Sequence, residues 1–168
     1  MERCSHALTV DGRIWLIDPV DNPRVDTLEN VTGVIQLLDR HNRDCAAVAK
    51  RLRVPHHVVP RDSIPPFGFI DIRRNRRWNE VALWWDDRRI LVCADALGSV
   101  AYFRAKNEPF GVHPLLRLFP PKRALGDLEP EHILFGHGSG YHGSDAPQRL
   151  RDALETSRRR LPRALLPG

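Results

Sequence analysis

The chain has 168 residues, of which 42% are hydrophobic and 28% are charged. These values are typical of one soluble globular domain, and the length is sufficient for a buried core. No apolar run approaches the length that a transmembrane helix needs, so we expect no membrane association. The net charge is +5, and arginine greatly outnumbers lysine, which permits an acidic partner.

The first half of the chain predicts a hairpin, a central strand and a helix. The elements in chain order are strands over 7–10, 14–17 and 34–38, a helix over 44–52, and a short strand over 57–59. Asp11 and Gly12, between the first two strands, form a pair typical of tight hairpin turns.

The second half continues with short apolar runs that alternate with helical patterns, which indicates a mixed α/β domain. Its elements are strands over 67–72, 81–85 and 90–94, a helix around 113–118, a strand over 133–135 and a helix over 146–160. We expect a single domain over residues 1–161 and a C-terminal tail over 162–168.

Neither the termini nor the basic runs point to secretion or to nucleic acid. The N-terminal segment lacks the apolar core of a secretory signal, and the three widely spaced cysteines form no disulfide or zinc pattern, so we expect a cytoplasmic protein. The basic runs over 73–77 and 158–160 have no interleaved aromatic residues that would stack on bases. We interpret them as a solvated loop and a basic C-terminal turn, and we rank nucleic-acid binding last.

Polar residues follow three of the predicted strands, over 39–45, 94–98 and 136–138. Residues just beyond the carboxyl ends of strands converge on one crevice in open α/β arrangements. These three segments are therefore the candidates for a functional site.

The order and setting of these segments resemble the metallo-β-lactamase family. The segments that carry the resemblance are the strand and turn over 12–19, the loop over 40–45, the strand over 90–94 before Asp95, and the strand before Gly136, His137 and Gly138. The resemblance covers nearly the whole chain. It implies an α/β (α+β) fold, a four-layer αββα sandwich, and hydrolysis of esters, thioesters, amides or phosphodiesters by metal-bound hydroxide.

The first metal position of the family is lost in this comparison. When the family pattern His-x-His-x-Asp-His is aligned on Asp44, Arg40 and Asn42 replace its first two histidines. The stretch from Arg77 to Asp95, where the third ligand belongs, contains no histidine. Arg40 would instead place a permanent positive charge there, because a guanidinium does not lose its proton in proteins.

The second metal position keeps four donors in this comparison. Asp44 matches the aspartate, Cys45 replaces a histidine, Asp95 matches the bridging carboxylate and His137 the last histidine. Such a set is acceptable for one zinc or iron ion, which would activate a bound water. His41 would then carry protons, so His41 and Asp44 are the catalytic candidates.

Each of these residues also has a purely structural interpretation. Asp44 would cap the helix, Cys45 would pack beneath it, and Asp95 would bond to its own turn. His137, between two glycines, would orient its loop. A protein without metal is therefore at least as consistent with the sequence as one with a single ion.

Two hypotheses of different class follow. The first is a divergent metallo-hydrolase-like protein that binds at most one metal ion. The alternative, which the sequence favours slightly, is a non-catalytic relative that binds a small anionic molecule or a protein partner through Arg40, Arg43 and His142. A homodimer that covers an exposed sheet edge stays open.

Overall fold

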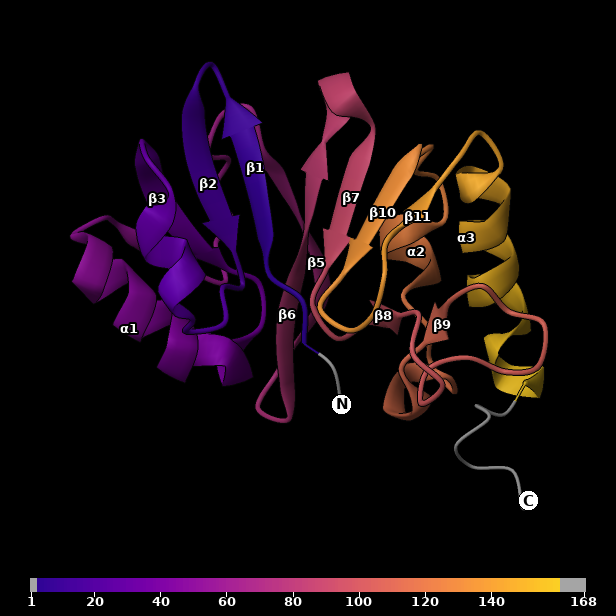
Figure 1. Cartoon of the computed structure of the whole chain (residues 1–168). Helices are drawn as coiled ribbons and strands as arrows, with labels where there is room; N and C mark the ends of the chain where they lie inside the picture. Colours follow the sequence, from indigo (N-terminus) through magenta and orange to yellow (C-terminus); the bar gives the residue numbers. More distant parts are fainter. Residues whose placement is uncertain (1–2, 161–168) are drawn as a thin grey trace.

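The computed structural model describes residues 3–160, apart from the side chain of Arg43. The predicted tail over 162–168 lies outside the described residues. Two β-sheets stack face to face, and helices cover the outer face of each sheet (Figure 1). This is the αββα sandwich of the α+β class that the sequence predicts.

The first sheet contains four strands in the order β1-β2-β3-β4. Their bounds are β1 (His6–Val10), β2 (Arg13–Ile17), β3 (Val31–Gln36) and β4 (His56–Val58). β1 and β2 pair antiparallel, whereas β2, β3 and β4 run parallel. Asp11 and Gly12 both have positive φ, at 49° and 75°, which confirms the predicted hairpin turn.

The second sheet has the strand order β11-β10-β7-β6-β5, and β8 and β9 form a separate small ribbon. The bounds are β5 (Gly68–Asn75), β6 (Trp78–Trp85), β7 (Ile90–Cys93), β8 (Leu97–Gly98), β9 (Gly111–Val112), β10 (His132–Phe135) and β11 (Tyr141–His142). β10 and β7 pair parallel, and the other neighbours in this sheet pair antiparallel.

The hairpin of β5 and β6 extends further than predicted. Arg73 and Arg74 pair with Glu80 and Asn79, beyond a bulge after Asp71. The interpretation of the whole run 73–77 as a loop is therefore wrong, because ladder pairing with β6 holds its first half in a strand.

Three helices lie on the outer faces. α1 (Asn42–Leu52) packs on β3 and β4, and α2 (Lys122–Leu125) and α3 (Ala146–Thr156) lie against the second sheet and its ribbon (Figure 1). α1 begins two residues earlier than predicted. The helix predicted around 113–118 is reduced to a 3-10 turn over Pro114–Leu116, and the end of the predicted last helix is a 3-10 turn over Ser157–Arg159. None of the helices in the described part is long and apolar enough to cross a lipid bilayer.

The main core lies between the two sheets, and a smaller core lies beneath α1. The main core is formed by residues such as Ile17, Ile35, Leu83, Leu91 and Phe135, all of them fully buried. Leu16, Val34, Cys45 and Val48 build the smaller one. Removal of this apolar surface from water is the chief stabilising contribution to the fold.

The two sheets join at the ends of their strands. The amide of Val81 donates to the carbonyl oxygen of Leu37 at 3.0 Å, and the amide of Cys4 donates to that of Gly136 at 2.9 Å. The arrowheads of β2, β7 and β10 point toward the same end of the sandwich (Figure 1). Side chains that follow these strands are consequently brought together.

Candidate functional site

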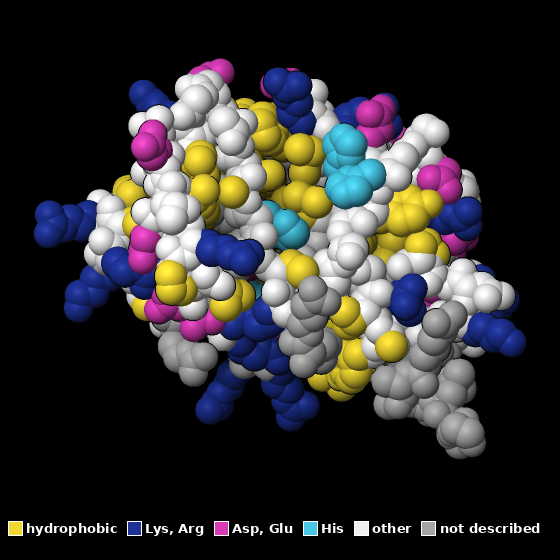
Figure 2. All heavy atoms as spheres, in the orientation of Figure 1, with side chains coloured by type: hydrophobic (Ala, Val, Ile, Leu, Met, Phe, Trp, Pro, Cys, Tyr) yellow, Lys and Arg dark blue, Asp and Glu magenta, His cyan; other side chains and the backbone are white. Residues whose placement is uncertain are grey.

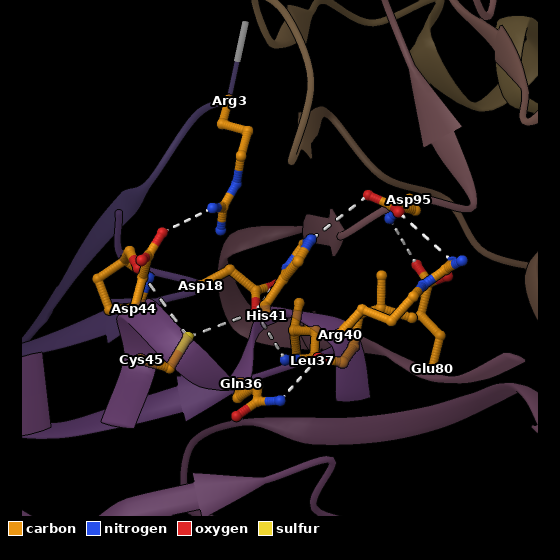
Figure 3. A network of polar contacts seen from close by, with 12 residues as sticks. Arg3, Asp18, Gln36, Leu37, Arg40, His41, Asp44, Cys45, Glu80 and Asp95 are labelled. Atoms are coloured by element: carbon orange, nitrogen blue, oxygen red, sulfur yellow. Dashed lines mark hydrogen bonds and ion pairs between the residues drawn. The ribbon is translucent and has the colours of Figure 1, made fainter. Parts of the chain in front are cut away.

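Four polar side chains from separate elements meet at this end of the sandwich, and we call them the strand-end cluster. Asp18 follows β2, His41 ends the 3-10 turn before α1, Asp95 follows β7, and His137 follows β10. Figure 3 shows His41 between Asp18 and Asp95. The loops that follow β7 and β10 touch, because a Cβ atom at Gly136 would collide with the carbonyl oxygen of Ala94.

Asp95 is the centre of the cluster. Its Oδ1 lies 3.2 Å from Nε2 of His137 and 3.6 Å from Nε2 of His41, and its Oδ2 lies 3.6 Å from a guanidinium nitrogen of Arg40. Burial opposes the charged carboxylate, but the contacts with His137 and His41 outweigh it and lower the pKa of Asp95. Asp95 is therefore an anion surrounded by nitrogen atoms.

His41 bridges two carboxylates. Its Nδ1 lies 3.1 Å from Oδ1 of Asp18, and the two groups form an ion pair. Burial favours the neutral imidazole, but Asp18 and Asp95 outweigh it and raise the pKa of His41 to about 9. His41 is consequently an imidazolium at neutral pH, with no free lone pair for a metal ion or for base catalysis.

Asp44 and Cys45 are turned to other partners. Asp44 accepts a hydrogen bond of 2.6 Å from Arg3. It lies in the first turn of α1, and His41 is the residue at the N-cap, so the interpretation of Asp44 as an N-cap is wrong. Sγ of Cys45 lies 4.0 Å from Oδ1 of Asp18 and 4.0 Å from the carbonyl oxygen of Pro19. Burial raises the pKa of Cys45, so its thiol stays protonated within the core under α1.

The sequence did not identify Glu80, which supports Asp95 from beneath. The fully buried Oε1 of Glu80 accepts from the amides of Asp95 at 3.0 Å and Ala96 at 2.9 Å, and its Oε2 accepts from Nε1 of Trp78 at 2.7 Å. Burial raises the pKa of Glu80 to about 7, although these hydrogen bonds oppose the rise. The available signal was a glutamate within an apolar strand, which needs buried donors.

An aromatic group containing His113 lies beside the cluster. The His113 ring packs 4.8 Å from Trp78, 5.4 Å from Tyr102 and 5.3 Å from Phe103, measured between ring centroids. Burial lowers the pKa of His113 to about 4, so the ring is neutral. One of these rings, Trp78, also contacts Arg40: the guanidinium carbon of Arg40 lies 4.6 Å from the centre of the Trp78 ring, a cation–π contact. Apolar rings therefore close this side of the site.

The remaining predicted residues are dispersed. The side chain of Arg40 is 49% exposed at the mouth of the cluster. The side chain of Arg43 lies outside the described residues. His142 lies in β11 and faces His132 across the edge of the second sheet.

The arrangement of the predicted metal ligands does not fit a metal ion. No three histidine, cysteine, aspartate or glutamate side chains within the described residues are placed to hold one. Asp95 contacts Arg40 and two histidines, Asp44 contacts Arg3, and the Cys45 thiol is protonated. Metal ions require deprotonated donors with accessible lone pairs. Here the carboxylate oxygens already form ion pairs with positively charged side chains.

Comparison with known proteins shows similarity in structure only. No family model matches the sequence, and no curated protein sequence is significantly similar to it. The rubredoxin oxygen:oxidoreductase of Desulfovibrio gigas superposes with a TM-score of 0.58 at 15% identity, over 92% of this chain and 54% of that one. A di-iron-bound form of TTHA1623 superposes with a TM-score of 0.57 at 18% identity, over 84% of this chain and 91% of that one. A metallo-β-lactamase from Erythrobacter litoralis superposes with a TM-score of 0.52 at 10% identity, over 90% of this chain and 80% of that one.

The chain has the metallo-β-lactamase fold. The predicted resemblance is thus confirmed for the architecture. This chain spans about half the length of the Desulfovibrio gigas protein, with 54% covered. Because identities are so low, these similarities indicate a shared fold, and activity has to be argued from the site itself.

Proposed function

We propose that this chain is a non-catalytic protein of the metallo-β-lactamase fold that binds a small anionic molecule at the mouth of the strand-end cluster. One observation carries the proposal: Asp95, which matches the bridging carboxylate of the family, contacts His41, Arg40 and His137. In this proposal, protein side chains supply the positive charge that metal ions supply elsewhere in the family.

The charge balance of the cluster supports the proposal. Asp18 and Asp95 carry two negative charges, and His41, with a pKa of about 9, together with Arg40 carries two positive charges. A divalent ion among these groups would add uncompensated positive charge in a region of low dielectric constant. A metal-bound hydroxide is therefore not part of the proposal.

The rim of the cluster supports an anionic ligand. The side chains of Arg40 and Arg3, which contact Asp95 and Asp44, are 49% and 32% exposed. Figure 2 shows Lys and Arg side chains gathered at the lower end of the drawn face. Guanidinium groups keep their charge and match carboxylate and phosphate oxygens in pairs.

The metal-free part is tested by elemental analysis and zinc titration of the full chain, beside Asp95→Asn and His137→Ala. The expected result is that neither substitution removes bound metal. About one equivalent of zinc or iron that is lost in both variants would overturn the proposal in favour of a single-metal hydrolase.

The anion-binding part is tested by calorimetric titration with pyrophosphate and with citrate. Arg40→Ala is expected to weaken binding about tenfold, the effect of losing one charge-assisted contact. Arg89→Ala, an exposed arginine paired with Glu131, is the matched control and should bind like the wild type. Equal binding by wild type and Arg40→Ala, or no binding of either anion, would contradict it.

A further inference from the structure

Two histidines face each other on the edge of the second sheet, away from the strand-end cluster. His132 in β10 and His142 in β11 are directly opposite in the antiparallel register. Their Nδ1 atoms lie 3.1 Å apart, and their ring centroids lie 5.2 Å apart. Figure 2 shows histidine side chains exposed side by side over this edge of the sheet.

The alternation of side chains along β10 fixes the face of the sheet from which this pair projects. Ile133 and Phe135 of β10 are fully buried, so His132, which alternates with them, projects from the opposite face. The amide of Gly143 donates to the carbonyl oxygen of Glu131 at 3.0 Å and holds β11 in register. A Cβ atom at residue 140 would lie 2.9 Å from Nε2 of His142, so Gly140 leaves room for that ring.

We propose that His132 and His142 bind one divalent zinc, nickel or copper ion through their Nδ1 atoms. Bonds from zinc to imidazole nitrogen are about 2.0–2.1 Å long, so two nitrogens 3.1 Å apart subtend an angle of about 100° at a shared ion. That angle lies between the square-planar and tetrahedral values, both of which these metals accept. Water or an anion fills the remaining positions.

The chemistry of the metal-free pair is compatible with this role. Where no ion is bound, one Nδ1–H donates to the other Nδ1. An ion binds when the donating ring carries its proton on Nε2 instead, so that the lone pairs of both Nδ1 atoms are free. Nearby acidic side chains are engaged elsewhere: Glu131 pairs with Arg89 at 3.0 Å, and Asp145 accepts from Tyr141 and Arg149. The two imidazoles therefore contact each other directly, without a carboxylate between their Nδ1 atoms.

The experiment is calorimetric titration of the full chain with Ni²⁺ and with Zn²⁺. One equivalent is expected to bind, and His132→Ala and His142→Ala are each expected to lower the affinity at least about tenfold, since one of two ligands is lost. His57→Ala, which removes a ring packed on Trp15, is the matched control and should bind like the wild type. Electron paramagnetic resonance of the Cu²⁺ form should show two coupled nitrogens, reduced to one in either variant.

The variant His137→Ala separates this proposal from the function proposed above. If His137→Ala still binds the metal ion and His142→Ala does not, the result supports the edge site. Loss in His137→Ala alone would overturn both proposals, because the ion would then lie in the strand-end cluster. No binding by the wild type, or equal binding by wild type and both edge variants, would overturn the edge site and leave the proposed function standing.

Discussion

The strand-end cluster and the edge pair use the same imidazole chemistry in opposite surroundings. In the cluster, His41 and His137 direct nitrogen atoms at Asp95, and the side chain of His41 is only 10% exposed. At the edge, His132 and His142 direct nitrogen atoms at each other near the surface. His137, which matches the last histidine of the family, and His41, which stands between two motif positions, are thus committed to ion pairs. The metal site that we propose uses two histidines outside the motif.

The difference teaches that burial decides what a polar side chain can bind. A buried charge needs a partner within the protein, because loss of hydration costs several kcal/mol per ion. His41 has two such partners and would have to lose both a proton and an ion pair to bind a metal. An exposed imidazole exchanges its proton with little change elsewhere. The predictions below test this contrast.

Asp95→Ala should have the largest effect on stability. The substitution leaves His41 and Arg40 without their shared carboxylate, and loss of one partner from a buried ion pair costs about 3–5 kcal/mol. Urea unfolding measures the change. Asp71→Ala, which breaks an exposed pair with Arg61, is the control and should cost less than about 1 kcal/mol. Equal losses in the two variants would remove the contrast between buried and exposed pairs.

The pH dependence of stability should reveal the charge on His41. Its pKa rises from 6.5 in the unfolded chain to about 9 in the fold, so its contribution is fully present below about pH 6.5 and is lost as the pH rises through about 9. The contribution is at most about 3–4 kcal/mol, since one pKa unit equals about 1.4 kcal/mol.

The measurement is the difference in unfolding free energy between wild type and His41→Gln, which should shrink from about pH 6 to about pH 10. The pKa of Glu80 is raised from 4.5 to about 7, so its contribution is lost in a lower pH range. It is present in both proteins and cancels in the difference. A difference that does not vary with pH would show that His41 is neutral.

Gly136→Ala should separate the loops that hold the cluster together. A Cβ atom there meets the backbone of Ala94, which cannot move aside as a side chain can, and overpacking of this kind costs about 1–3 kcal/mol. Gly68→Ala is the control, since its Cβ atom would lie 3.8 Å from the nearest other atom, the carbonyl oxygen of Trp84. Thermal unfolding compares them, and an unchanged midpoint in Gly136→Ala would contradict the close approach.

Arg40→Ala should have the smallest effect on stability. The guanidinium is half-exposed and its ion pair with Asp95 is long, at 3.6 Å, so the loss should be less than about 1 kcal/mol. Urea unfolding measures it beside Arg40→Lys. A loss as large as that of Asp95→Ala would mean that Arg40, and not His41, neutralises the cluster.

Much of the fold could be predicted because it depends on local patterns. The Asp11-Gly12 turn, the apolar run of β7 and the strand before His137 are each readable within a few residues. The two-residue strands β8, β9 and β11 were missed, since so short a pattern has no period to detect. The alanine-rich pattern over 44–52 predicted α1, but the helix begins two residues earlier, at Asn42.

The sequence by itself determined a mixed α/β domain and the three strand ends that meet in the fold, because alternation of apolar residues specifies which faces are buried. The sandwich architecture was implied by the resemblance to the metallo-β-lactamase family. Only the tertiary structure decided which side chains meet there. Arg3 reaches Asp44 across 41 residues of sequence, Glu80 enters the site from a strand that carries no motif, and Asp18 enters from the turn after β2. Such pairings depend on how the two sheets stack, and a pattern along the sequence does not show which distant residues lie close together in space.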